Sequence, residues 1–408
     1  MLRRVKLGDI AVSQTGPFGS QLHEEDYVEE GTPIVTVEHL GDIGFTTQNL
    51  PFVSEADTKR LSKYLLKEGD IVFSRVGSID RCVYVKREQE NWLFSGRCLR
   101  VRCDSTKINP RFLSYYFKQP EFKKMMLNIS VGATMPSLNT TLMDTLPLLL
   151  VDRDIQDNIA HFLDIIDKKI ENNNTINSEL EALAKTIYDY WFLQFEFPNE
   201  EGLPYKSNGG RMVWSEELKR EIPEGWEVKS IFDVADVVYG YPFSTECFSD
   251  TEGVPVIRIR DILNNSTSAF TSEEVESRYL TKEKDLLIGM DGIFHMNFWT
   301  RDGDYVNQRV VRIRTECLIS VLHIYYEILP FIKSREQNVA RSTVGHLSDK
   351  DMKSLKILVP NTNNYYDTFD TLLTKICNNR KENQELAALR DWLLPMLMNG
   401  QVGFKDEV

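Results

Sequence analysis

Residues 6–20 read KLGDIAVSQTGPFGS and residues 230–245 read SIFDVADVVYGYPFST, and both stretches carry a Pro-Phe pair near their ends. Four more matched stretches follow in the same order, at residues 30–40 and 252–262, 64–74 and 279–289, 96–102 and 308–314, and 138–151 and 347–360. Their common order predicts a tandem duplication of one fold. The spacing between matches shrinks along the chain, as expected if the two copies have loops of different length.

Each copy is predicted to be a mixed domain of short strands and helices, which makes the fold class α+β. The alternating patterns IVTVEHL (34–40), DIVFSRV (70–76) and CLRVR (98–102) favour strands. The stretch NPRFLSYYFKQPEFKKMM (109–126) has a period near 3.6 and favours a helix. Between the copies, the Pro, Gly and Asn residues of 194–225 are typical of a loop linker.

A heptad seam of mostly apolar residues follows each mixed domain, from Ile159 to Trp191 and from Tyr365 to Leu397. Asparagines interrupt both seams at the same central place, namely Asn173, Asn177, Asn379 and Asn383. An antiparallel pairing sets Asn173 opposite Asn383, and buried asparagine pairs satisfy each other only in that register. The sequence therefore predicts two long helices in an antiparallel coiled coil. The alternative is that each helix packs only on its own domain.

The predicted boundaries follow from the repeat and the seams. They are a first mixed domain at 1–152, a long helix at 153–193, the linker at 194–225, a second mixed domain at 226–361, a second long helix at 362–399 and a tail at 400–408.

The composition limits the kinds of site that the chain can carry. Its formal net charge of -13 argues against binding nucleic acid over the whole surface, so any such site must be local. The six cysteines and six histidines show neither C-x-x-C nor H-x-x-x-H spacing, and we expect no metal site. No apolar stretch is long enough for a membrane span, and a cytoplasmic location is expected.

Catalytic motifs are missing from the sequence. No two prolines are adjacent, which removes the D/N-P-P-Y/F loop of amino-group methyltransferases. No glycine is followed by lysine, which removes the P-loop, and no G-x-G-x-x-G follows a strand. We therefore expect neither a catalytic constellation nor a cofactor site in this chain.

Several of these stretches together resemble the specificity subunit of type I restriction-modification systems. They are GPFGS (16–20), EGTPIVTVEHL (30–40), KEGDIVFS (67–74), LPLLLV (146–151) and GLPYKSNGGRMVWSEELKREIPEGWEV (202–228). The resemblance covers essentially the whole chain. One departure is KDLLIG at 284–289, where the first copy has GDIVFS, so the loop that follows is expected to differ between the copies.

The resemblance implies two target-recognition domains, each reading one half of a bipartite double-stranded DNA sequence, with the long helices as a spacer. It also implies binding to two adenine-N6 methyltransferase subunits that hold S-adenosylmethionine, and a complex that can add restriction and translocase subunits. The chain itself would be non-catalytic. Two alternatives stay open: a stand-alone duplicated DNA-binding scaffold without a methyltransferase partner, and an enzyme with an unfamiliar site.

A duplicated reader should share its scaffold and phosphate contacts, whereas the residues that read bases should differ between the copies. Residues 75–102 contain seven basic and three acidic residues, so this stretch is locally basic, as a DNA-binding surface should be. Shared arginines at positions 97, 100 and 102 of the first copy, and 309, 312 and 314 of the second, are phosphate-contact or structural candidates. The predicted DNA-binding residues are Ser74, Arg75, Ser78, Arg81, Arg97, Thr134, Asp291, His295, Asn297, Arg309, Arg341 and Thr343.

Overall fold

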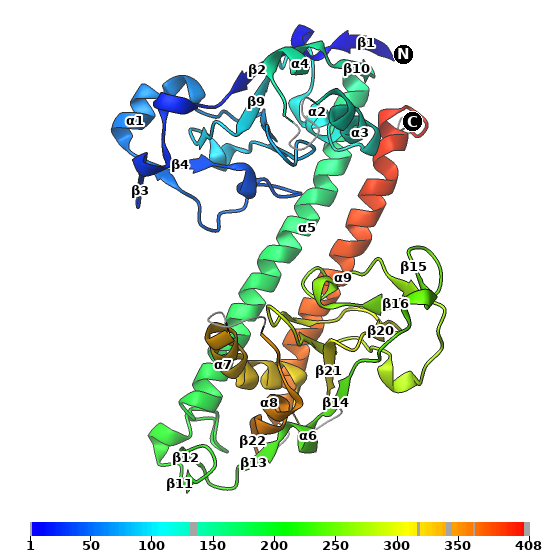
Figure 1. The fold of residues 1–408 in the computed structure, drawn as a ribbon. Coiled ribbons are helices and arrows are strands. Elements are labelled where there is room, and N and C mark those ends of the chain that lie inside the picture. The colour runs from blue at the N-terminus through cyan, green and yellow to red at the C-terminus, as the bar shows by residue number, and fades with distance from the viewer. Residues whose placement is uncertain (1, 131–136, 316–318, 340–344, 362–363, 404–408) are drawn as a thin grey trace, which may run out of the picture. The chain divides into compact units, whose positions relative to one another are not determined.

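The computed structural model describes residues 2–130, 137–315, 319–339, 345–361 and 364–403. The chain forms two compact units (Figure 1). Unit 1 comprises Met1–Glu171 with Glu385–Val408, and unit 2 comprises Asn172–Gln384. The boundary between the units falls inside both long helices, so each unit contains one mixed domain and one half of each helix.

Unit 1 contains two four-stranded sheets and a two-stranded ribbon. The first sheet has the order β2 (Ala11–Thr15), β9 (Cys98–Cys103), β6 (Asp70–Ser74), β7 (Cys82–Tyr84). The second has the order β3 (Tyr27–Val28), β5 (Phe52–Val53), β4 (Thr32–Val35), β8 (Leu93–Phe94), and β1 (Arg3–Lys6) pairs with β10 (Pro147–Leu150). Its short helices are α1 (Glu55–Arg60), α2 (Pro110–Tyr116), α3 (Pro120–Ile129) and α4 (Thr140–Thr145).

Unit 2 repeats this arrangement in the same strand order. One sheet runs β14 (Asp236–Tyr239), β21 (Val310–Arg314), β18 (Leu286–Gly289), β19 (Met296–Phe298), and the other runs β15 (Phe248–Ser249), β17 (Phe270–Thr271), β16 (Val254–Ile257), β20 (Tyr305–Val306). The ribbon is β13 (Glu227–Ser230) with β22 (Lys356–Val359), and the helices are α6 (Ile231–Val234), α7 (Val321–Val339) and α8 (Asp349–Ser354). The common topology confirms the predicted duplication of one α+β fold.

The same buried ion pair holds the centre of both sheets. Arg102 donates to the two carboxylate oxygens of Asp70 at 2.7 and 2.6 Å. Arg314 donates to Asp285 at the same two distances in unit 2. Each guanidinium also donates to a backbone carbonyl, Arg102 to that of Leu65 and Arg314 to that of Leu280, so both shared arginines support the fold, as the structural alternative states. It also applies to Arg100 and Arg312, whose side chains are buried.

The stretch predicted as one helix at 109–126 is two helices. α2 ends at Tyr116 and α3 begins at Pro120. Proline lacks the N–H that a helix interior requires and is tolerated in the first turn, so the break falls immediately before Pro120.

The segment 194–225 is more ordered than a loop linker. It contains a hairpin of β11 (Met212–Ser215) and β12 (Arg220–Pro223). Phe195, Phe197 and Ile222 are buried in the core of unit 2. The Pro, Gly and Asn residues of the segment predicted turns, but its aromatic side chains fix it to the domain that follows.

The long helices are α5 (Arg153–Tyr188), which a π-helical turn extends through Asp189–Leu193, and α9 (Asn364–Met398). They lie side by side within each unit (Figure 1). In unit 2 the Asn173 amide donates to Asn383 at 2.9 Å and the Asn379 amide donates to Asn177 at 2.8 Å. The residue number rises on one helix while it falls on the other, as an antiparallel coiled coil requires.

His323 on α7 makes unit 2 sensitive to acid. The imidazole is buried, and burial lowers its pKa to about 3. The neighbouring carboxyl of Glu327, 3.8 Å from Nε2, accepts a hydrogen bond from Tyr188, and burial raises the pKa of this carboxyl.

We expect His323 to remove about 2 kcal/mol of folding free energy between pH 7 and pH 5. Histidine in the unfolded chain has a pKa of about 6.5, so between pH 7 and pH 5 it binds a proton, whereas the folded side chain stays neutral. The contribution is present above that pKa and is lost as the pH falls toward 3. Urea unfolding of the full chain at both pH values should show that His323→Leu lacks this share of the loss. Equal losses in the two proteins would contradict the prediction.

Candidate nucleic-acid interface

At one edge of unit 1, Arg75 ties three loops together directly after β6. Its N–H donates to the carbonyl of Arg97 at 2.8 Å, and its carbonyl accepts from the N–H of Leu138 at 2.9 Å. The guanidinium donates to the carbonyls of Leu138 and Gly96, both at 3.2 Å. Arg75 is therefore half-buried and anchored, and its main role in this arrangement is to hold the loops in place.

Unit 2 builds the same backbone framework after β18, with Met290 in place of Arg75. The N–H of Met290 donates to the carbonyl of Arg309 at 2.9 Å, and its carbonyl accepts from the N–H of Leu347 at 2.8 Å. The turns that follow are closed by equivalent backbone hydrogen bonds. The N–H of Ser74 donates to the carbonyl of Arg81 at 3.0 Å, and the N–H of Gly289 donates to the carbonyl of His295 at 2.9 Å. These contacts match Arg75 with Met290, Arg97 with Arg309, Leu138 with Leu347 and Arg81 with His295, although the turn of unit 2 is one residue shorter.

The side chains on this shared framework differ. An isolated bridge joins Val76 to Ser137 in unit 1, and the corresponding bridge in unit 2 joins Asp291 to His346. The Asp291 carboxylate lies 2.7 Å from Nδ1 of His346 and 3.3 Å from Nε of Arg309. Unit 1 thus presents small neutral groups where unit 2 presents a charged cluster. Conserved backbone with exchanged side chains is the arrangement expected of two readers of different sequences.

Several predicted residues lie on the exposed part of these edges. Ser78, Arg81 and Arg97 are exposed in unit 1, and Arg309 is exposed in unit 2. Arg97 and Arg309 occupy the same place in both copies, which suits a contact to phosphate. Arg81 corresponds to His295, which is partly exposed, so this position suits direct contact with bases.

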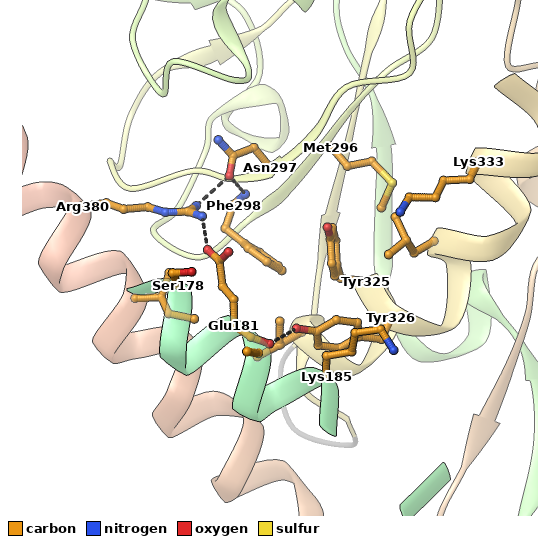
Figure 2. A pocket seen from close by; sticks show the side chains of 14 residues that line it. Ser178, Glu181, Lys185, Met296, Asn297, Phe298, Tyr325, Tyr326, Lys333 and Arg380 are labelled. Carbon is orange, nitrogen blue, oxygen red and sulfur yellow. Dashed lines mark hydrogen bonds and ion pairs between the residues drawn. The ribbon is translucent and has the colours of Figure 1, made fainter. Parts of the chain in front are cut away.

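Two predicted DNA-binding residues make hydrogen bonds within the fold. Ser74 is fully buried at the end of β6, and its hydroxyl donates to the carbonyl of Val76 at 3.1 Å. The amide of Asn297 donates to the carbonyls of Ile262 and Leu263 at 3.0 and 3.1 Å. Its oxygen accepts from Arg380 at 2.7 Å. Figure 2 shows this pair in the wall of a pocket of unit 2. Both side chains are therefore engaged in hydrogen bonds within the fold.

Three further predictions, Thr134, Arg341 and Thr343, lie outside the described residues. Sequence reasoning missed His346, although the signal was present. His346 immediately precedes Leu347, which matches Leu138, so His346 corresponds to Ser137. Because residues that read bases should differ between the copies, this difference could have selected His346.

The part of the chain that the structure describes contains no cluster of three or more His, Cys, Asp or Glu side chains that could hold a metal ion. Within the same ranges, no helix is both long and apolar enough to cross a bilayer.

Comparison with known proteins identifies the family. The model of the type I restriction modification DNA specificity domain matches residues 3–182 and 223–388. The MjaIX specificity subunit of Methanocaldococcus jannaschii is 26% identical over 370 residues, covering 87% of this chain and 82% of the relative. The HindI specificity subunit of Haemophilus influenzae is 22% identical over 407 residues, covering 84% and 88%.

A similar fold has been solved by crystallography. The S subunit of a type I restriction-modification system from M. genitalium has a TM-score of 0.59 and 14% identity, covering 100% of this chain and 97% of the other. This likeness concerns the fold alone. Because the family model matches most of the chain in two tandem segments, this chain belongs to the family of type I restriction-modification DNA specificity proteins.

Proposed function

We propose that this chain is the DNA sequence-specificity subunit of a type I restriction-modification complex and reads a bipartite target, one half-site with each unit. The observation that carries the proposal is the pair of edges around Arg75 and Met290. They share their backbone hydrogen bonds and differ in their side chains. The exposed arginines on both edges supply positive charge locally on an acidic chain.

The chain would position two adenine-N6 methyltransferase subunits, which hold S-adenosylmethionine, and restriction subunits where these are present. The recognition chain would be non-catalytic and without a cofactor of its own. Family membership and the names of the relatives, which are specificity subunits of restriction enzymes, support this division of labour. Transfer of tritiated methyl groups by the isolated chain would contradict it, and failure to co-purify with a methyltransferase subunit would favour the stand-alone scaffold.

Mapping methylated adenines in DNA from cells that express the intact complex tests the proposal directly. The expected result is one target with two half-sites separated by a gap of fixed length and unspecified sequence. Methylation without a bipartite target, or with only one half-site, would refute the proposal that each unit reads DNA.

Replacing Arg81 with alanine should weaken recognition of the first half-site by about 1 to 3 kcal/mol, the range for a lost bidentate base contact. The second half-site should be unaffected, because Arg81 belongs to unit 1 alone. Competition binding of the intact complex with oligonucleotides altered in one half-site measures both effects.

Arg97→Ala is the matched control, since an arginine shared by both copies should contact phosphate. It should weaken binding to all sequences alike and make the dependence on salt shallower. If Arg81→Ala behaves in this same uniform way, Arg81 is a phosphate contact and the assignment to bases is wrong.

A further inference from the structure

Among the described residues, each candidate reading edge carries a large apolar side chain that is exposed. In unit 1 it is Phe18, which is 58% exposed. In unit 2 it is Ile293, which is 61% exposed and lies in the turn between β18 and β19. The two residues come from different loops and do not occupy corresponding positions in the two copies.

The exposure of Phe18 is specific to unit 1. Phe243 belongs to the matching Pro-Phe pair, but it is only 7% exposed and packs against Tyr241 and Tyr305, with ring centroids 5.0 and 5.2 Å away. Gly96 leaves the space that the backbone of Pro17 and Phe18 occupies. A side chain at this position would lie 2.5 Å from the carbonyl oxygen of Pro17 and 2.8 Å from Cβ of Phe18.

The ring of Phe18 is held in place at the edge. The guanidinium of Arg75 lies 5.8 Å from its centroid and covers one face, and the carbonyls of Leu138 and Gly96 fix that guanidinium. With one face covered, the ring offers its rim and its other face to a ligand. This arrangement suits contact along the surface of a groove better than insertion between stacked bases, which requires a free projecting ring.

Ile293 is displayed by a tight turn. Gly292 has a φ of 72°, and its N–H donates to the carbonyl of Gly345 at 2.9 Å. The carbonyl of Ile293 accepts from the N–H of His295 at 2.9 Å. An aliphatic side chain has no π face with which to stack on a base and can gain only by burying its apolar surface.

Resting on the proposed function, we propose that Phe18 and Ile293 each contact the C5 methyl group of a thymine in the half-site read by their own unit. The thymine methyl is the apolar group that base pairs present in the major groove. The exposed arginines of the same two edges, Arg97 in unit 1 and Arg309 in unit 2, fit the flanking phosphates. Each half-site would therefore include an A·T pair recognised through its methyl group.

Deoxyuridine in place of thymine tests the proposal, because it removes the methyl group and keeps the base pairing. With the intact wild-type complex, one thymine of the first half-site should respond to replacement with about fourfold weaker binding, as expected for one buried methyl group. Phe18→Ala should bind thymine DNA about as weakly and show no further loss with deoxyuridine. Ile293→Ala should show the same pattern in the second half-site only.

Val12→Ala is the control, because Val12 is a 67% exposed apolar residue of β2 in the same unit. It should retain the wild-type response to deoxyuridine. Equal sensitivity in wild type and Phe18→Ala would overturn the proposal for Phe18, and impaired assembly of Phe18→Ala with the methyltransferase subunit would assign the ring to a protein contact instead. If wild type shows no bipartite target on thymine DNA, the proposed function itself fails, which is a separate result.

Discussion

Replacing Arg390 with alanine is expected to destabilise unit 1 by about 1.5 to 3 kcal/mol, the contribution of a buried hydrogen bond to a charged group. Arg390 on α9 donates to the Asp167 carboxylate on α5 at 2.8 Å, and Asp167 is 1% exposed. The carboxylate also accepts from Arg111 at 3.2 Å and from the hydroxyl of Tyr115 at 2.8 Å. Burial alone would raise the pKa of Asp167, but Lys118 and Arg390 hold it below its usual value.

Unit 2 shows how the same place is filled without charges. The two helical seams match with Ala184 in the place of Arg390 and Leu373 in the place of Asp167, and both residues are buried in the core of unit 2. The double variant Asp167→Leu with Arg390→Ala should therefore recover most of the stability that the single variant loses. Arg111 would keep a partner in this variant, because it also pairs with Asp164 at 2.8 Å.

Urea unfolding of the full chain measures these differences. Arg153→Ala is the control, because Arg153 forms an exposed pair with Asp157 on α5 and should change the free energy of unfolding by less than about 1 kcal/mol. A loss below about 1 kcal/mol for Arg390→Ala would contradict the prediction. A double variant no more stable than the single one would show that the ion pair is not interchangeable with apolar packing.

The duplication and the helix pairing could be predicted from sequence because both leave periodic or repeated signals. Matched strings revealed the two copies, and the heptad positions set Asn173 opposite Asn383, the pair that the structure joins. The pattern could not explain Arg390, an arginine in a mostly apolar seam. Its partner Asp167 lies off the seam, and only the packing of α9 against α5 and α2 shows that the two meet.

The reading edges were predictable as loops, whereas the direction of each side chain was not. Ser74 was selected as a polar residue beside Arg75, but both faces of β6 are buried, and Ser74 is buried with the rest of the strand. Phe18 was missed for the opposite reason, because its Pro-Phe pair recurs in the second copy and therefore indicated scaffold. Whether a repeated residue is buried depends on its neighbours, such as Gly96, which Gln308 replaces in the second copy.

Transferring the unit 2 side chains to the unit 1 framework should abolish recognition of the first half-site. The triple variant Val76→Asp, Arg81→His and Ser137→His copies the residues of unit 2 at three corresponding positions. It places an Asp-His pair beside Arg97, as Asp291 and His346 lie beside Arg309. The backbone should tolerate the exchange, because the same hydrogen bonds carry these side chains in unit 2.

Methylation of the native target by the intact complex should fall at least about 100-fold, since the loss of one good base contact already costs about 1 to 3 kcal/mol and the new charges are misplaced for the old bases. Recognition of the second half-site should not change. Cys98→Val is the matched control, because it copies a buried scaffold residue, Val310, and should leave both half-sites as they are. If the triple variant methylates the native target as well as the control does, the edge around Arg75 does not read the first half-site, and the framework that the two units share must serve another purpose.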